Sequence, residues 1–254
     1  MRCSYVLVIA AACGGSPSGG NAGVDASTLD VTTGQAGGEI AVLRVNDGTM
    51  MTATASFFDG SDNAVIIGSV DECRVTTAPN PAVTISAGTI TITGPATPVT
   101  LAPTGEKPSV VYAPAIFPVP ADETSLAMSA TGADFPAFTA DGLVPARIAG
   151  FTPPASLSRG SGYTAAWDTA GAGWRFRIEI VANPTSPSEL YVMTCDVPDS
   201  GTYEIPAAAF ALFPPATDAQ VSVMRYTQVT VENGAASFVV GAIEGTTSAI
   251  PLES

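Results

Sequence analysis

The side chains that could do chemistry in this chain are carboxylates and cysteines, because its 254 residues include no histidine. Without histidine, neither a serine–histidine–aspartate triad nor a cysteine–histidine pair can form. Glycine-rich phosphate-binding loops and the G-x-S-x-G motif are also absent, and Lys107 is the only lysine. We therefore expect a protein that is not an enzyme and that carries no cofactor.

Paired carboxylates are the one catalytic arrangement that the composition leaves open. Three pairs of nearby acids are candidates: Asp71 and Glu72, Asp122 and Glu123, and Asp196 and Asp199. All three lie in expected turns, and adjacent acids on a strand would point to opposite faces. Solvated turn residues are the favoured interpretation. The alternative is a carboxylate-dependent glycan hydrolase of the cell envelope.

One short acidic cluster could bind a metal ion. Asp59, Asp62 and Asn63 offer the oxygen ligands that calcium prefers, but they lack the spacing of an EF-hand loop. An ordinary Asp-Gly turn is therefore favoured over a calcium site. No zinc site is expected, because Cys73 and Cys195 are too few to supply one.

Aromatic residues in the second half could bind a glycan, because carbohydrate-binding sandwiches stack sugar rings on exposed aromatic side chains. The candidates are Trp174, Trp167, Tyr163 and Tyr191. Trp174 begins an expected strand beside a glycine-rich loop, where it could stand at the rim of a binding face. Packing in the core is the favoured role for both tryptophans.

The composition restricts the class of partner. A net charge of −14 disfavours nucleic acid, whose phosphates require basic patches, and equally disfavours electrostatic docking to anionic lipid. Hydrophobic residues make up 46% of the chain, which is enough for a sizeable core.

The first sixteen residues indicate where the protein resides. Arg2 gives a positive start, residues 5–12 form a short apolar run, and small residues lead into Cys13. The run is too short to span a bilayer, which needs roughly 20 apolar residues. This order resembles a bacterial lipoprotein signal peptide, with residues 1–12 as the signal and Cys13 as the lipidated cysteine. An ordinary secreted protein or a buried N-terminal strand is the alternative.

The lipoprotein resemblance implies an exported protein that a lipid anchors to the bacterial envelope. Gly14 stands where enterobacterial lipoproteins retained in the inner membrane carry aspartate, so the resemblance favours the outer membrane. Cys3 would leave with the signal, so Cys73 and Cys195 would remain. These two could pair in an oxidising compartment. Because they fall in different expected domains, two separate core cysteines are favoured over a disulfide.

Turn residues and alternation predict the organisation of the rest. Residues 13–38 are rich in glycine and serine without apolar periodicity, which predicts a flexible linker. Beyond them, short β-prone runs separated by glycine and proline indicate an all-β protein. The prolines between Phe151 and Pro154 predict a boundary between a β-rich domain over 39–150 and a second domain over 151–254.

The second half has the clearest strand signals. Trp174 to Ile180 alternates strictly, which places Arg175, Arg177 and Glu179 on one face, where cross-strand charge pairs can form. The Asn-Gly pair within residues 232–235 predicts a hairpin, and Pro206 to Phe213 is a helical candidate.

About seven strands in some 100 residues resemble an immunoglobulin-like or fibronectin-III-like sandwich, although the Cys…Trp…Cys spacing of immunoglobulin domains is absent. The expected fold is thus two β-sandwich-like modules, an arrangement similar to that of uncharacterised δ-proteobacterial lipoproteins. We expect a structural or interaction module that contacts an envelope protein or glycan, and whose sheet edges could recruit a partner strand.

Overall fold

The structure is a computed structural model that describes residues 36–45, 49–59, 65–77, 83–184, 190–231, 236–245 and 249–253. Within these residues, every element except one four-residue helix is a β-strand. The prediction of an all-β fold of the sandwich type is confirmed. The expected signal peptide and Cys13 lie outside the described residues.

The strands before the expected boundary are mostly short. They are β1 (Gly37–Val45), β2 (Met50–Phe58), β3 (Ile66–Val70), β4 (Cys73–Thr77), β5 (Ile90–Thr93), β6 (Val99–Leu101), β7 (Pro103–Thr104), β8 (Val111–Tyr112), β9 (Ala115–Pro118), β10 (Ser125–Ala130) and β11 (Phe138–Leu143).

The strands after the boundary include the longest ones. They are β12 (Leu157–Ser158), β13 (Tyr163–Ala166), β14 (Arg175–Pro184), β15 (Tyr191–Pro198), β16 (Thr202–Ile205), β17 (Ala216–Val231), β18 (Ala236–Gly245) and β19 (Ile250–Glu253). The helix α1 (Ala207–Phe210) lies where the sequence predicts a helical turn. The predicted hairpin is also confirmed, because β17 and β18 pair antiparallel up to Val231 and Ala236.

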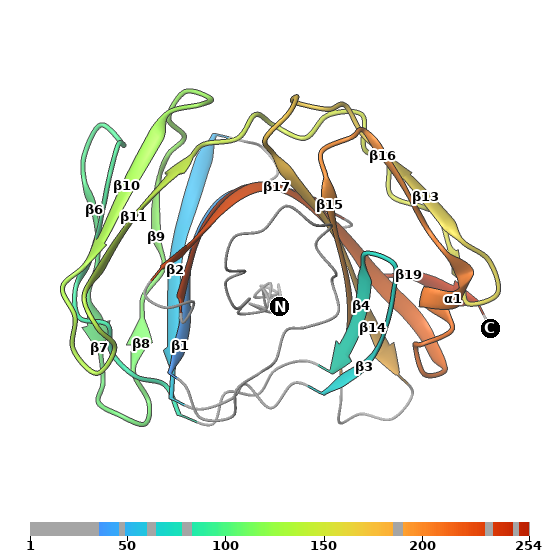
Figure 1. The fold of residues 1–254 in the computed structure, drawn as a ribbon, viewed down its shortest axis with the longest axis horizontal. Coiled ribbons are helices and arrows are strands. Elements are labelled where there is room, and N and C mark those ends of the chain that lie inside the picture. Colours follow the sequence, from blue (N-terminus) through green and yellow to red (C-terminus); the bar gives the residue numbers. More distant parts are fainter. Residues whose placement is uncertain are drawn as a thin grey trace, which may run out of the picture.

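One large sheet organises the molecule. Its main path runs β3-β4-β15-β14-β17-β18-β1-β2-β9, and all neighbours are antiparallel except β1 and β18. Figure 1 shows this sheet bent into an arch, with β17 passing across its top. The sheet β11-β10-β5-β6 covers one outer side of the arch, and the pair β13-β16 covers the other.

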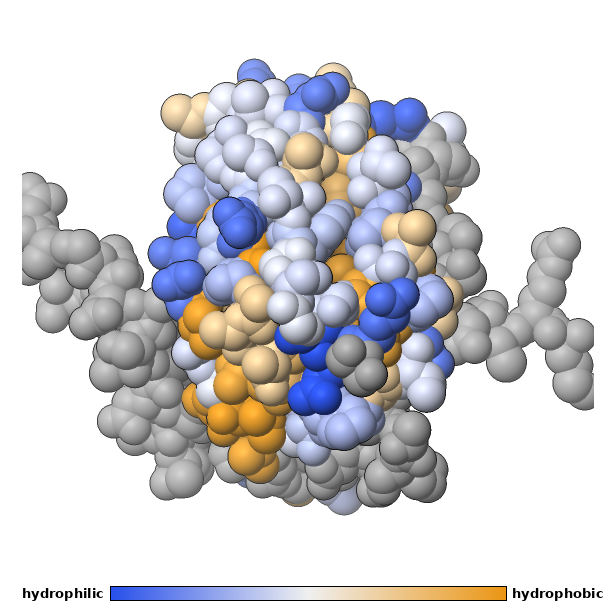
Figure 2. Space-filling view, turned by 90° about the vertical axis from the view of Figure 1, so that its right-hand side faces the viewer, coloured by the Kyte–Doolittle hydropathy of each residue, from blue (hydrophilic) through white to orange (hydrophobic). Residues whose placement is uncertain are grey.

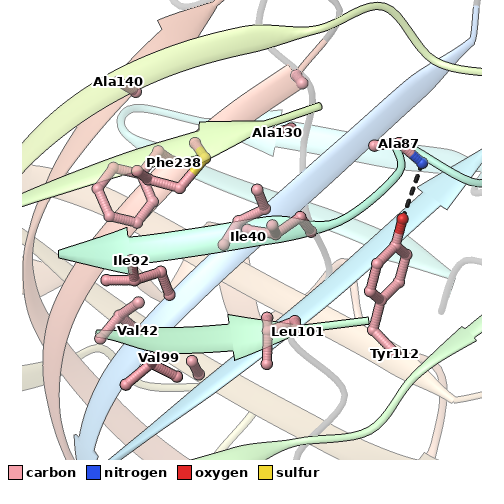
Figure 3. Close-up of a cluster of buried hydrophobic side chains, with 14 of the residues drawn as sticks. Ile40, Val42, Ala87, Ile92, Val99, Leu101, Tyr112, Ala130, Ala140 and Phe238 are labelled. Carbon is pink, nitrogen blue, oxygen red and sulfur yellow. Dashed lines mark hydrogen bonds between the residues drawn. The ribbon is translucent and has the colours of Figure 1, made fainter. Parts of the chain in front are cut away.

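Two hydrophobic cores lie between the large sheet and these outer layers. The first core includes Ile40, Val42 and Phe238 of the large sheet and Ile92 of the outer sheet (Figure 3). The alternating isoleucines of β5, Ile90 and Ile92, are both buried, because every second residue of a strand points to the same face. Tyr112 adds a polar anchor, because its hydroxyl accepts a hydrogen bond from the backbone N–H of Ala87 at 2.8 Å.

The second core forms on the other side of the arch. The large sheet contributes Phe176, Ile178 and Ile180 of β14, and the outer layer contributes Phe210 of α1. The long strand β17 reaches both cores on one face, since Val221 and Val223 pack in the second core and Val231 packs in the first. A strand that serves two cores fixes one core relative to the other.

The strands cross the expected domain boundary between Phe151 and Pro154. β3 and β4 precede the boundary, yet β4 pairs with β15 and packs in the second core. β18 follows the boundary, yet it pairs with β1 and packs in the first core. The large sheet therefore runs through both expected domains, 39–150 and 151–254.

The expectation of two separate core cysteines is wrong. Cys73 lies directly opposite Cys195 in the β4–β15 ladder, and the two form a disulfide within the second core. The expectation failed because it placed the cysteines in different domains, whereas β4 crosses over to β15. The disulfide joins residues that are 122 positions apart in sequence.

The first described strand takes in the end of the expected linker, residues 13–38. Gly37 and Gly38 belong to β1, where they pair with Phe58 and Phe57 of β2. A Cβ atom on Gly38 would collide with the ring of Phe57. Glycine at this position therefore makes room for a core phenylalanine.

Candidate functional site

The candidate site lies on the face of the large sheet that points away from both cores. Figure 1 places the outer layers outside the arch, so this remaining face lines its concave side. We call it the inner face. It carries Glu39, Ala41 and Leu43 of β1, Arg177 and Glu179 of β14, Asp196 of β15, Met224 and Tyr226 of β17, and Val239 of β18.

Strand alternation explains why charged residues stand on this face. Phe176, Ile178 and Ile180 turn into the second core, which leaves Arg177 and Glu179 on the opposite side of β14. The charged residues are nevertheless buried, with 7% of Arg177 and 7% of Glu179 exposed. The sheet is thus buried on both faces in this region, although the sequence pattern resembles that of a half-exposed strand.

Arg177 is the centre of a polar cluster on the inner face. Its Nη2 donates to Asp196 Oδ2 at 3.2 Å and to the Tyr226 hydroxyl at 3.3 Å, and its guanidinium carbon lies 4.9 Å from the centre of the Tyr226 ring. The Tyr226 hydroxyl in turn donates to Asp196. Arg175 donates to Asp196 from Nε at 3.0 Å. The predicted cross-strand charge pairs are therefore confirmed.

Burial changes the protonation of this cluster. Burial raises the pKa of Tyr226 to about 12, although the Arg177 charge opposes the shift. Burial also raises the pKa of Glu179 to about 7, again against the opposing effect of Arg177. The pKa of Glu39 rises to about 7 through burial, with Arg177 lowering it and the Glu179 charge raising it further. Burial therefore favours the neutral form of both glutamates.

A second polar network lies in the second core and is fully paired. Asp199 accepts hydrogen bonds from Arg225 Nε at 2.8 Å, from the Trp167 indole N–H at 2.6 Å and from the backbone N–H of Ala170 at 3.0 Å. Arg225 also donates to the carbonyl of Arg147 at 2.8 Å. A buried charge with all its partners in place is typical of a structural element.

The four aromatic candidates for glycan binding do not form one surface. Trp167 is buried, with its ring stacked on Phe176 at a centroid distance of 3.7 Å. Trp174 is partly exposed and precedes β14. Tyr191 lies at the opposite end of the β14–β15 hairpin, about eight residues or roughly 25 Å along the ladder. Tyr163 stands on the outer strand β13 and packs against the second core.

The acidic candidates lie in turns or in ion pairs. Asp71 and Glu123 adopt left-handed turn conformations, with φ of 50° and 62°. Asp122 accepts a hydrogen bond from Arg44 at 2.7 Å. Of the calcium candidates, Asp59 pairs with Lys107 Nζ at 2.7 Å, whereas Asp62 and Asn63 lie outside the described residues. Across the part of the chain that the structure describes, no group of three or more potential ligands could hold a metal ion.

Sequence reasoning did not identify Glu39 and Glu179 as candidate site residues. Glu179 was placed correctly on the polar face of its strand, but its burial could not be seen from alternation. Glu39 was harder still to identify. It joins the inner face because β1 pairs with β18, and this pairing between distant segments cannot be read from the sequence.

Comparisons with known proteins identify no family for this chain. No protein-family model matches the chain, and no curated protein is significantly similar to it. In the described residues, no helix is both long enough and apolar enough to cross a membrane.

Proposed function

We propose that this protein is a non-enzymatic, lipid-anchored envelope protein. It would bind another envelope protein by pairing its own edge strand β3 with a strand of that partner. The lipid on Cys13 would hold the protein at the membrane, and residues 14–35 would give it reach. The observation that carries the proposal is the edge strand β3, which has exposed apolar residues and, among the described residues, no strand on its outer side.

The disulfide between Cys73 and Cys195 supports export. Disulfides form and persist in oxidising compartments and are rare in the reducing cytosol. This disulfide is buried in the second core, so it is part of the folded structure. Export through the lipoprotein route also agrees with the apolar run that precedes Cys13.

The β3 edge has the composition of a binding strand. β3 ends the path of the large sheet, so its outer backbone groups have no strand beside them among the described residues. Val65, Ile66 and Ile67 are 57%, 48% and 41% exposed. Figure 2 shows this side of the molecule, with apolar residues gathered in its lower part. Exposed apolar edge strands are sites for strand addition.

The opposite edge of the same sheet is better protected. β9 is preceded by Pro114 and ends at Pro118, and proline blocks pairing because it has no N–H group. β3 contains neither proline nor a charged residue. The two edges of one sheet therefore differ in their ability to accept a partner strand, and β3 is the open one.

In-cell photo-crosslinking tests this proposal. A benzophenone amino acid at Ile67 should give a discrete adduct with one envelope protein, and Ile66→Lys should remove that adduct by placing a charge in the interface. The matched control puts the same probe at Ile116, which is 67% exposed on β9. No adduct at Ile67, or equal adducts at Ile67 and Ile116, would contradict strand addition at β3.

A further inference from the structure

The hydrogen bonds of β4 decide which backbone groups of β3 face outward. The backbone N–H of Asp196 donates to the carbonyl of Glu72 at 3.2 Å, which directs this carbonyl toward β15. The N–H of Thr77 donates to the carbonyl of Val65 at 2.9 Å, which directs Thr77 toward β3. Because the bonding direction alternates from residue to residue along a strand, Arg74 directs its backbone groups toward β15 and away from β3.

Two residues of β3 therefore direct their backbone groups away from β4. Ser69 lies opposite Arg74, and Ile66 lies opposite Thr76, which also faces β15. Ser69 and Ile66 are three positions apart and would otherwise face opposite sides, but the register shift between Ile66 and Gly68 gives both the same outward orientation. The outer edge of β3 thus offers an N–H and a carbonyl at each of two positions to a further strand.

One end of this edge is apolar. Residues 65–67 are large apolar residues that are between 41% and 57% exposed. β15 begins beside them, because Tyr191 pairs with Thr77 and Thr77 bonds to Val65. Leu190 comes directly before Tyr191 and is 41% exposed. A partner strand with apolar side chains at this end would remove this surface from water.

The other end of the edge is acidic. The exposed residues Asp71 and Glu72 form the turn that connects β3 to β4. Among the residues that the structure describes, no ion pair joins either carboxylate to a basic side chain. A lysine or arginine on the partner strand would meet the opposite charge here.

We propose that β3 takes an antiparallel strand that begins with lysine or arginine and continues with alternating apolar residues. Antiparallel strands pair more stably than parallel ones, and this direction places the start of the partner beside Asp71. The inference rests on the proposed strand addition and names the kind of segment that β3 selects. A second copy of the chain fits poorly, because antiparallel pairing of two β3 strands places each acidic turn beside the apolar end of the other.

Peptide titration of the full-length protein tests this selection. The probe is a fluorescent peptide, Lys-Lys-Thr-Val-Thr-Ile-Thr-Val, and its anisotropy reports binding. One comparison peptide carries two glutamates in place of the lysines, and another has the residues of the probe in reverse order. The probe should bind about fivefold more tightly than either comparison peptide at low salt, and added salt should reduce the difference.

A proline variant tests the contribution of the backbone. Ser69→Pro removes an N–H that points outward, so it should leave the pairing of β3 with β4 intact and weaken the binding of every peptide. An unchanged urea midpoint would show that this variant folds. Ser69→Ala keeps the N–H, and this matched control should bind the probe like the wild type.

A charge variant tests the contribution of the acidic turn. The double variant Asp71→Asn with Glu72→Gln should bind the lysine and glutamate peptides equally well. Asparagine suits position 71, where φ is 50°. Glu106→Gln removes a charge from an exposed loop elsewhere and should keep the preference of the wild type for the lysine peptide.

Four results would overturn the inference. They are no binding of the lysine peptide, equal binding of both charge forms by the wild type, unchanged binding of the probe by Ser69→Pro, and a dimer of the protein that Ser69→Pro dissociates. The adduct at Ile67 is measured separately in cells. An adduct without any peptide preference would contradict only the selection, whereas the absence of the adduct would contradict strand addition itself.

Discussion

The Arg225 guanidinium meets the Asp199 carboxylate, with Nε 2.8 Å from Oδ2, at the level where β17 passes from the second core to the first. Both side chains are almost fully buried. Arg225 also binds backbone carbonyls at Arg147 and Asp168, so it holds the segment that connects the two halves of the chain. One buried ion pair thus joins the sheet, the connecting segment and the second core.

Replacing Arg225 should be strongly destabilising. Arg225→Met would leave the Asp199 carboxylate buried without its cation, which typically costs about 3–5 kcal/mol. Urea unfolding should show this loss in the free energy of unfolding. Lys107→Ala removes an exposed ion pair with Asp59, which water and salt screen, so it should lower the free energy of unfolding far less than Arg225→Met. Equal losses in the two variants would show that Arg225 does not hold the cores together.

Removing the disulfide should also lower stability. A double variant with Cys73→Ser and Cys195→Ser opens a closed loop of more than a hundred residues, for which the chain-entropy estimate is about 4–5 kcal/mol. The expected result is a lower urea midpoint than that of the oxidised wild type. Wild-type protein treated with a reductant should approach the same midpoint. A midpoint insensitive to both treatments would argue against the native pairing of Cys73 with Cys195.

Trp167 should prove structural. Trp167→Phe keeps an aromatic ring beside Phe176 but removes the N–H that Asp199 accepts, which should cost about 1–3 kcal/mol. Trp174→Phe is the matched variant, and it should change the free energy of unfolding by much less because Trp174 is partly exposed. A larger effect at Trp174 would reverse these assignments.

The contribution of Glu39 and Glu179 to the free energy of unfolding should fall as pH rises from about 4.5 to about 7. Their pKa is raised from 4.5 to about 7, so the folded state holds protons that the unfolded chain has released, and this favours folding at the acidic end. Each group contributes at most about 1.4 kcal/mol per pH unit across that window.

Glu39→Gln isolates this effect. The difference in unfolding free energy between Glu39→Gln and the wild type should shift in favour of the variant as pH rises from 4.5 to 7.5. Glu106→Gln serves as the exposed control, with a constant difference expected. A constant difference for Glu39→Gln as well would mean that Glu39 is not held in its neutral form.

The sequence was most informative about single strands in which apolar and polar residues alternate regularly. Phe176, Ile178 and Ile180 turn into the second core, opposite the charged face that the alternation of Trp174 to Ile180 predicts. Long-range pairing was not accessible, because alternation identifies a strand's faces but not its neighbours. Cys73 shows the consequence, since its disulfide depends on β4 leaving its own half of the chain to pair with β15.

The inner face was hidden for the same reason. Arg177 and Glu179 carry the pattern of a solvated strand face, yet both are buried in the folded protein, which alternation alone does not reveal. Asp196 was taken for a turn residue, whereas it is the acceptor that holds both Arg175 and Arg177.

Mass spectrometry of the protein isolated from its native membrane tests the proposed membrane anchor at Cys13. An anchored protein should yield a mature chain that begins at Cys13 and carries a diacylglycerol group on the sulfur, with residues 1–12 removed. A chain that still begins at Met1, or one whose Cys13 is unmodified, would contradict it.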